Sequence, residues 1–201
     1  MPKPSSQRPE VVDDQGLPVR VLQRVDQLRA LAHPRRMDIL DLLIADGPLT
    51  ASECAARLGD SAASCSYHLR QLARFGFVTE AEGGAGRNRP WQWVPMGNRI
   101  ETTGSPAERS AAEALSTVID ARNIDRIRQY RTRHATDPWR ESATMSDWAI
   151  RLTEDELVEL GQALSDLLAP LQRRTFAGEA PDGARLVDVV TYLMPRTDDH
   201  A

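Results

Sequence analysis

The sequence is poor in aromatic residues, lysine and cysteine. Aromatic residues make up 5% of 201 residues while hydrophobic residues make up 41%, so a core must consist mainly of Leu, Ala, Val and Ile, which favours helices. Every basic residue except Lys3 is arginine, which we attribute to compositional bias. Two cysteines, Cys54 and Cys65, are too few for a disulfide framework and predict reduced thiols.

Long apolar runs are also lacking. The first ten residues, M-P-K-P-S-S-Q-R-P-E, contain no apolar core of a signal peptide, and no run of about 18 apolar residues follows. We therefore expect a soluble, cytoplasmic protein that makes no contact with membranes.

Motifs of catalysis are few. No glycine-rich phosphate loop follows a strand, and no local pattern indicates a Ser-His-Asp triad. The acidic residues after Thr153 are explained by helix capping and the helix dipole. The sequence therefore predicts a protein that is not an enzyme and that holds no cofactor or metal.

Charge differs between the two halves of the chain. The net charge is −4, but residues 1–100 hold 13 basic and 11 acidic residues, a net charge of +2, and residues 101–201 hold 12 and 18, a net charge of −6. Double-stranded DNA is a polyanion, so the first half is the better candidate for binding it.

The segment Glu53–Val78 has the pattern of a helix-turn-helix. A short helix ends at Gly59-Asp60, where glycine permits a positive φ, and a second helix runs from about Ser61 to Arg74. The second helix has a narrow apolar stripe of Cys65, Leu69 and Leu72, and its opposite face carries small residues first and arginines later.

That opposite face has the order a recognition helix needs in a major groove, with the backbone close to the bases at its start and positive charge near phosphates further on. His68 stands at the edge of the face, where two roles are equally open: donating to a phosphate or packing beside the second predicted strand. The predicted DNA-contacting residues of this helix are Ala63, Ser64, Ser66, Tyr67, His68, Arg70 and Arg74.

Two further sets of arginines are candidates for DNA contact. Alternating runs at 77–82 and 89–94 flank a glycine-rich turn and predict a hairpin, or wing, whose Arg87 and Arg89 suit a minor groove; the alternative is a solvated turn. Arg35 and Arg36 open a helix at Pro34, whose first amides suit a backbone phosphate.

These segments together resemble ArsR-like winged-helix transcriptional regulators. The resemblance rests on L-R-A-L-A-H-P-R-R-M-D-I-L, L-T-A-S-E-C-A-A-R-L-G and S-C-S-Y-H-L-R-Q-L-A-R-F-G-F-V, between about Leu28 and Val94. It implies a homodimeric repressor that binds operator DNA and releases it on a signal. The metal-sensing pattern of that family does not carry over, because Cys54 and His134 each stand alone where the family places ligand sets.

The fold class we expect is mainly α with a small β part (α+β). Residues 1–18 are expected to be a disordered tail, 19–97 a winged helix-turn-helix domain that starts with a helix over Val19–Ala32, and 104–201 a dimerisation or effector domain. Pro95–Pro106 is expected to be a linker, and a helix from about Ser105 to His134 a dimer spine, with an ordinary core helix as the alternative. Strands are expected at Met145–Leu152 and Leu186–Met194, around a helix that a capping box opens at Thr153.

The function that the sequence favours is a sequence-specific DNA-binding transcriptional regulator, more in keeping with a repressor than an activator, that reads a pseudo-palindrome as a homodimer. One alternative is a protein-interaction module that uses the leucine stripe of residues 157–171. Another is a ligand-gated sensor in which Trp139 and Trp148 line a pocket for a small-molecule effector. A redox switch at Cys54 and Cys65 is opposed by the absence of nearby cationic side chains that would lower a thiol pKa.

Overall fold

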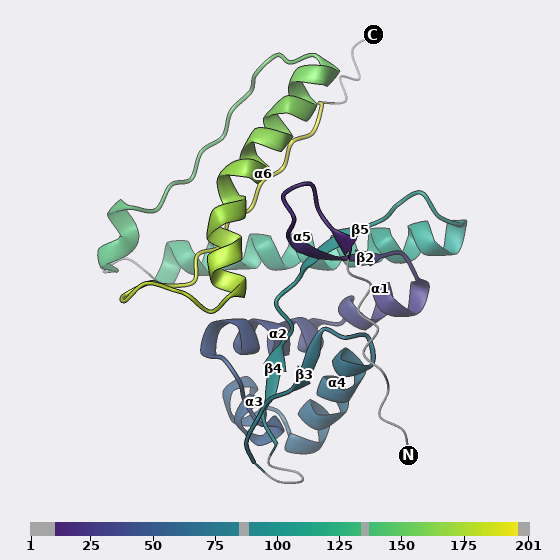
Figure 1. The fold of residues 1–201 in the computed structure, drawn as a ribbon, viewed down its shortest axis with the longest axis vertical. Helices are drawn as coiled ribbons and strands as arrows, with labels where there is room; N and C mark the ends of the chain where they lie inside the picture. The colour runs from purple at the N-terminus through teal and green to yellow at the C-terminus, as the bar shows by residue number, and fades with distance from the viewer. Residues whose placement is uncertain (1–10, 85–88, 134–136, 197–201) are drawn as a thin grey trace. The chain divides into compact units, whose positions relative to one another are not determined.

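The computed structural model describes residues 11–84, 89–133 and 137–196, which fall into two compact units, Met1–Ala121 and Arg122–Ala201 (Figure 1). The division lies within one long helix, so the expected domain limits 19–97 and 104–201 stay a prediction. The expected fold class, mainly α with a small β part, is confirmed. In the described part of the chain, none of the helices has the length and apolarity to span a membrane.

Four helices form most of the first unit, with boundaries close to those expected. They are α1 (Val25–Leu31), α2 (Pro34–Asp46), α3 (Ala51–Leu58) and α4 (Ala62–Arg74). The break between α1 and α2 falls at His33, whose backbone is extended, and Pro34 is the first residue of α2. The ring of Pro34 disfavours a helical backbone at His33 and suits the first turn of the new helix.

Local capping sets the two ends of α3. The Thr50 side chain accepts the backbone N–H of Glu53, and the Glu53 carboxylate accepts the backbone N–H of Thr50 at 2.7 Å, which confirms the expected capping box. The helix ends at Gly59, which has a left-handed backbone with φ of 61°. A residue with a side chain would be strained there, so this turn between α3 and α4 depends on glycine.

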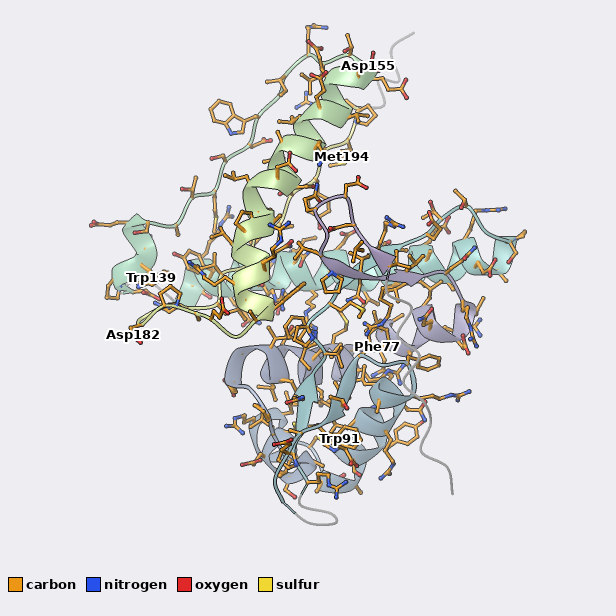
Figure 2. All side chains as sticks on the ribbon, viewed as in Figure 1. Phe77, Trp91, Trp139, Asp155, Asp182 and Met194 are labelled. Carbon is orange, nitrogen blue, oxygen red and sulfur yellow. The ribbon has the colours of Figure 1, made fainter. Side chains whose placement is uncertain are left out.

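The expected hairpin after α4 is present. Strand β3 (Val78–Glu80) pairs antiparallel with β4 (Trp91–Trp93), and Leu49 adds an isolated bridge to Trp91 through two backbone hydrogen bonds. The hairpin therefore joins the segment that precedes α3 to the segment that follows α4. Figure 2 labels Phe77 and Trp91 in this part of the unit, and Phe77 is fully buried.

One apolar core runs through the first unit. It draws side chains from α1, α2, α3, α4, the start of β3 and the first turns of the long helix, and these aliphatic residues pack at almost no exposure. Its most completely buried members are Leu22, Leu28, Ile39, Cys54, Cys65, Leu69, Leu72, Ala112 and Leu115.

The N-terminal segment differs from the expectation. Strand β1 (Val11–Val12) pairs antiparallel with β2 (Pro18–Leu22), and β2 pairs in parallel with β5 (Gly97–Ile100). The expectations of a disordered tail over residues 11–18, of a helix from Val19 and of a linker over 95–106 are therefore wrong. The apolar spacing of P-V-R-V-L fits both a helix and a strand. The strand is decided by its parallel partner, which lies far along the chain, so the local pattern does not distinguish the two.

A buried arginine joins this sheet to the helices. Arg20, on β2, donates to the Asn98 side chain at 3.0 Å and to the backbone carbonyl of Gly76 at 2.5 Å, and its guanidinium lies 4.4 Å from the centre of the Phe77 ring. Burial lowers the pKa of Arg20 to about 10. Gly76 closes the turn after α4, so Arg20 fixes the C-terminal end of that helix against the sheet.

The second unit contains the C-terminal part of α5 (Pro106–Arg133), a short 3₁₀ helix η2 (Pro138–Glu141) and α6 (Glu154–Phe176). The expected long helix and the capping box at Thr153 are confirmed. The expected strands at Met145–Leu152 and Leu186–Met194 are not formed, because neither segment has a partner strand among the residues described. The C-terminal segment runs alongside α6 (Figure 1).

We expect Arg20→Met to lower the free energy of unfolding of the first unit by about 2–4 kcal/mol, because the Gly76 carbonyl and the Asn98 side chain lose a charged donor. Chemical denaturation followed by circular dichroism measures this change. Arg24→Met is the matched control, since the Arg24 side chain is exposed and, among the described residues, pairs only with Asp26 at the surface, an interaction worth less than about 1 kcal/mol. Equal losses in the two variants would contradict the anchoring role of Arg20.

Candidate nucleic-acid interface

The exposed face of α4 follows from the burial of the opposite face. Cys65, Leu69 and Leu72 are fully buried in the core, which fixes the rotation of the helix about its axis. The residues turned to solvent on the other side are Ala62, Ala63, Tyr67, Arg70 and Arg74, with Ser64, Ser66 and Gln71 partly exposed. Six of the seven predicted contact residues of this helix therefore lie at least partly on the surface.

Hydrogen bonds and an ion pair stabilise the N-terminal end of α4. The Ser61 side chain caps the helix by accepting the backbone N–H of Ser64 at 3.1 Å. The hydroxyl of Ser64 donates to Asp60 at 3.1 Å, and Asp60 forms an ion pair with Nε of Arg35 at 3.1 Å. The backbone N–H of Ser61, the Ser64 hydroxyl and Arg35 together hold the pKa of Asp60 below its usual value.

The middle of the exposed face is lined by hydrogen-bonding groups. Tyr67 is 53% exposed, and Arg70, one turn further on, donates to the Ser66 hydroxyl at 2.8 Å. This bond from i+4 to i orients the guanidinium along the helix and leaves its other N–H groups open to an acceptor. Arg74 lies over the Phe75 ring, 5.4 Å from its centre, at the C-terminal end.

His68 is not part of this face. It is 9% exposed, and its ring lies 4.7 Å from the ring of His33, at the start of α2. Neither Nδ1 atom has a hydrogen-bond partner among the described residues. His68 therefore packs in the interior, against His33 at the start of α2 and not beside the second strand as expected, and its burial opposes the predicted DNA contact.

Arg35 and Arg36 are both engaged within the protein. Arg35 donates to the Leu58 carbonyl at 3.2 Å in addition to its ion pair with Asp60, so it ties α2 to the turn between α3 and α4. Arg36 donates to the carbonyls of Ala30 and Arg29 at the end of α1. These bonds satisfy helix-terminal carbonyls, and phosphate contact by either arginine stays a prediction.

Of the two arginines predicted to contact DNA from the wing, Arg89 is among the described residues. Arg89 donates to the Glu80 carboxylate at 2.5 Å, at the loop end of the β3–β4 hairpin, and both side chains are about half exposed. Arg87 lies outside the described residues. In the free protein Glu80 therefore neutralises Arg89, and a phosphate would have to compete with that carboxylate.

Arg20 is the residue that sequence reasoning missed. It shapes the candidate interface indirectly, because it holds the turn at Gly76 that connects α4 to the wing. A signal was present in the alternation of Pro18–Leu22, where a lone arginine stands among apolar residues. The apolar spacing of Val19–Ala32 predicts a helix, and in a helix Arg20 would not be placed on a buried strand.

The two cysteines do not have the properties of a redox pair. Both are free and fully buried in the core. Burial, and then the neighbouring Cys65, raises the pKa of the Cys54 thiol to about 11, and burial also raises the pKa of Cys65. A raised pKa disfavours the reactive thiolate. No group of three or more potential metal-binding side chains converges in the parts of the chain described.

Comparison with known protein families agrees with this geometry. Residues 31–81 match the family model of a helix-turn-helix domain. That match begins at the end of α1 and ends just after β3, so it spans α2, α3, α4 and the first strand of the wing. It covers about a quarter of the chain, and it supports a DNA-binding transcriptional regulator.

One solved structure with a similarity to this chain is a transcriptional regulator from Thermotoga maritima. The two are 13% identical over 73% of this chain and 88% of the other, with a TM-score of 0.29. At that score the likeness carries no argument about fold or function. A comparison with curated proteins gave no match.

The two packed histidines give a pH dependence of stability. Burial lowers the pKa of both, and Arg36 lowers it further for each; for His68 the neighbouring His33 contributes as well. The folded state then binds protons less readily than the unfolded state. We expect the unfolding free energy to be highest above about pH 7 and to fall as the pH drops towards 5.

His68→Gln should make that dependence shallower, because glutamine does not titrate, and His33→Gln should do the same. Denaturation series between pH 7.5 and pH 5 measure it, a range in which carboxylates such as Asp60, whose pKa is lowered, stay ionised. An unchanged pH dependence in both variants would show that the ring pair does not control it.

Glu80→Gln tests the state of the wing. Removing the carboxylate charge releases Arg89 for phosphate, so we expect tighter DNA binding, whereas Arg89→Ala should weaken binding and reduce the slope of log K against log salt by about one. Fluorescence anisotropy across a salt series measures both. Weaker binding by Glu80→Gln would contradict a phosphate-contacting Arg89.

Proposed function

We propose that this protein is a sequence-specific DNA-binding transcriptional regulator that binds a pseudo-palindromic operator as a homodimer and represses transcription. The observation that carries the proposal is the exposed face of α4, within a segment that matches a helix-turn-helix domain. The ArsR-like resemblance of the sequence agrees with a repressor of this kind.

The α4 face fits a major groove chemically. Small residues near its start, Ala62 and Ala63, allow the backbone to approach base edges closely. Tyr67 and Arg70 follow with hydrogen-bonding groups, and Arg74 adds positive charge where the helix would leave the groove. The Ser66 hydroxyl accepts one N–H of Arg70, and a guanidinium can pair with the two acceptors of a guanine.

A homodimer is the oligomeric state that suits a DNA-binding unit of this kind. A single helix reads only a few base pairs, and two copies related by a two-fold axis read a palindrome one DNA turn apart. The long helix α5 leaves the DNA-binding unit and continues into the second unit, which makes it a candidate spine between copies.

The two alternative functions receive less support. Trp148, proposed as a wall of an effector pocket, is 80% exposed, so it does not line an enclosed cavity. Trp139 is also exposed and lies against Arg185, 5.2 Å from ring centre to guanidinium. The leucine stripe of α6 is half-buried at Leu157, Leu160, Leu164 and Leu168, although Leu167 and Leu171 stay exposed.

Arg70 provides the central test. We expect Arg70→Ala to weaken binding to the selected operator by about 1–3 kcal/mol, with a smaller effect on unrelated DNA, if the guanidinium pairs with a guanine. Operators are obtained by selection from random duplexes, and binding is measured by electrophoretic mobility shift and anisotropy.

Two further variants sharpen the result. Arg70→Lys keeps the charge but loses the two-pronged fork, so a base-reading role predicts a loss close to that of alanine, and a phosphate role predicts near-normal binding. Arg99→Ala is a charge-matched control on β5, outside the helix-turn-helix. The proposal fails if the wild-type protein binds no DNA in a salt-dependent manner.

A further inference from the structure

An open cavity of about 580 Å³ lies beside the last turn of α4, within the first unit. Its other walls come from α1 and the residue before it, from the start of α2 and from the first turn of α5. Four of the side chains that line it are arginines: Arg24, Arg29, Arg36 and Arg74. Four guanidinium groups around one cavity create a positive potential that attracts an anion.

Two carboxylates also line the cavity, and both are already bound. Asp26 accepts two hydrogen bonds from Arg24, at 3.1 and 2.8 Å, so these two charges neutralise each other. Glu108 accepts the backbone N–H of Ser105 at 2.7 Å, and this bond lowers the pKa of Glu108. Because four arginines stand against two carboxylates, the lining keeps two positive charges in excess.

Arg36 is the half-buried arginine of the cavity. It donates through Nε to the carbonyl of Ala30 and through Nη2 to the carbonyl of Arg29, the latter at 2.7 Å. Carbonyl groups at the C-terminal end of a helix repel anions, and these two belong to the end of α1. Arg36 therefore reduces that repulsion, and its Nη1 has no partner among the described residues.

Arg29 and Arg74 differ from the arginines that the fold uses internally. Both side chains are exposed, and within the described part of the chain neither forms an ion pair or a hydrogen bond. The guanidinium of Arg74 lies 5.4 Å from the centre of the Phe75 ring, a contact that leaves its N–H groups open. Both arginines can therefore donate to an acceptor in the cavity without breaking a bond inside the protein.

The cavity continues the exposed face of α4. Tyr67, Gln71 and Arg74 follow at spacings of four and three residues, so they lie on one side of the helix, and the last two line the cavity. α1 packs beside α4. A major groove is about 12 Å wide and a helix with its side chains about 10–12 Å across, so phosphates are left to residues beside a bound helix, such as Arg29.

The form of the cavity favours a phosphate of DNA over a free anionic ligand. Pockets for small molecules enclose most of the ligand and have mainly apolar walls. This cavity is open, and charged side chains make up much of its lining. A backbone phosphate is already held in place by the rest of the duplex, so a few charge-assisted hydrogen bonds suffice to bind it.

We propose that Arg29, Arg36 and Arg74 together bind a backbone phosphate of the operator, next to the base pairs that α4 contacts. The proposal rests on the DNA binding of the proposed function. It extends the interface to α1, since Arg29 precedes the helix-turn-helix match, which begins at residue 31.

Arg29→Met is the central variant, because the Arg29 side chain has no internal partner to lose. We expect the Kd for the operator and the Kd for unrelated duplex DNA to rise by the same factor, about tenfold, since a phosphate carries no sequence information. Arg29→Lys keeps the charge and should bind nearly as tightly as the wild-type protein. Arg99→Met, on β5 and outside the cavity, is the charge-matched control. Fluorescence anisotropy measures all four proteins.

Ethylation interference identifies the phosphate itself. We expect one position at which ethylation of the operator weakens binding by the wild-type protein, and we expect this interference to disappear in both Arg29→Met and Arg74→Met. Interference that each variant loses at a different position would overturn a shared site.

Inorganic phosphate is the probe for a free anion. In the ¹⁵N-labelled full-length protein we expect the operator to shift the Nε–Hε resonance of Arg29, and inorganic phosphate at the same ionic strength to leave it unchanged. A shift caused by inorganic phosphate and absent with the operator would assign the cavity to a free anion and overturn its assignment to DNA.

The binding data also separate this proposal from the proposed function. If Arg29→Met binds both DNAs as the wild-type protein does while Arg70→Ala loses affinity for the operator, the phosphate site is overturned and the function of α4 stands. A loss confined to the operator in Arg29→Met also overturns it, because that result indicates base contact. A wild-type protein that binds no DNA overturns both proposals.

Discussion

The burial of one stripe of α4 is the constraint on which the candidate interface depends. Cys65, Leu69 and Leu72 have no exposed surface, and a helix with one face held in a close-packed core cannot rotate. Everything that the opposite face presents, from Ala63 to Arg74, follows from that burial. Core packing thus determines which side chains of the helix-turn-helix are exposed on its surface.

Three arginines support this helix from inside the protein. Arg35 joins α2 to the turn before α4 through Asp60 and the Leu58 carbonyl, Arg36 satisfies carbonyls at the end of α1, and Arg20 holds the turn after α4. Each donates to backbone carbonyl, carboxylate or amide oxygens of the protein itself. In a chain with almost no lysine, a basic residue near α4 is therefore not by itself evidence of DNA contact.

Local signals predicted the helical part of the fold well. The capping boxes at Thr50 and Thr153, the break at His33-Pro34 and the glycine turn at Gly59 act over a few residues, so the sequence carries them in full. The small sheet of β1, β2 and β5 was missed because its parallel pairing joins Val19 to Gly97, and a pairing over that separation leaves no local trace. His68 was undecided for a similar reason, since only the fold brings His33 against it.

The sequence by itself determined where α2, α3, α4, α5 and α6 lie and which face of α4 is apolar, because side-chain periodicity and capping are properties of neighbouring residues. Tertiary structure alone decided that His68 is interior, that Arg35 and Arg36 are engaged, and that Arg20 links the sheet to Gly76. These outcomes depend on distances between segments far apart in the chain. The segments Met145–Leu152 and Leu186–Met194 show the limit of local patterns. Their apolar spacing predicts strands, but neither segment pairs with another strand among the residues described.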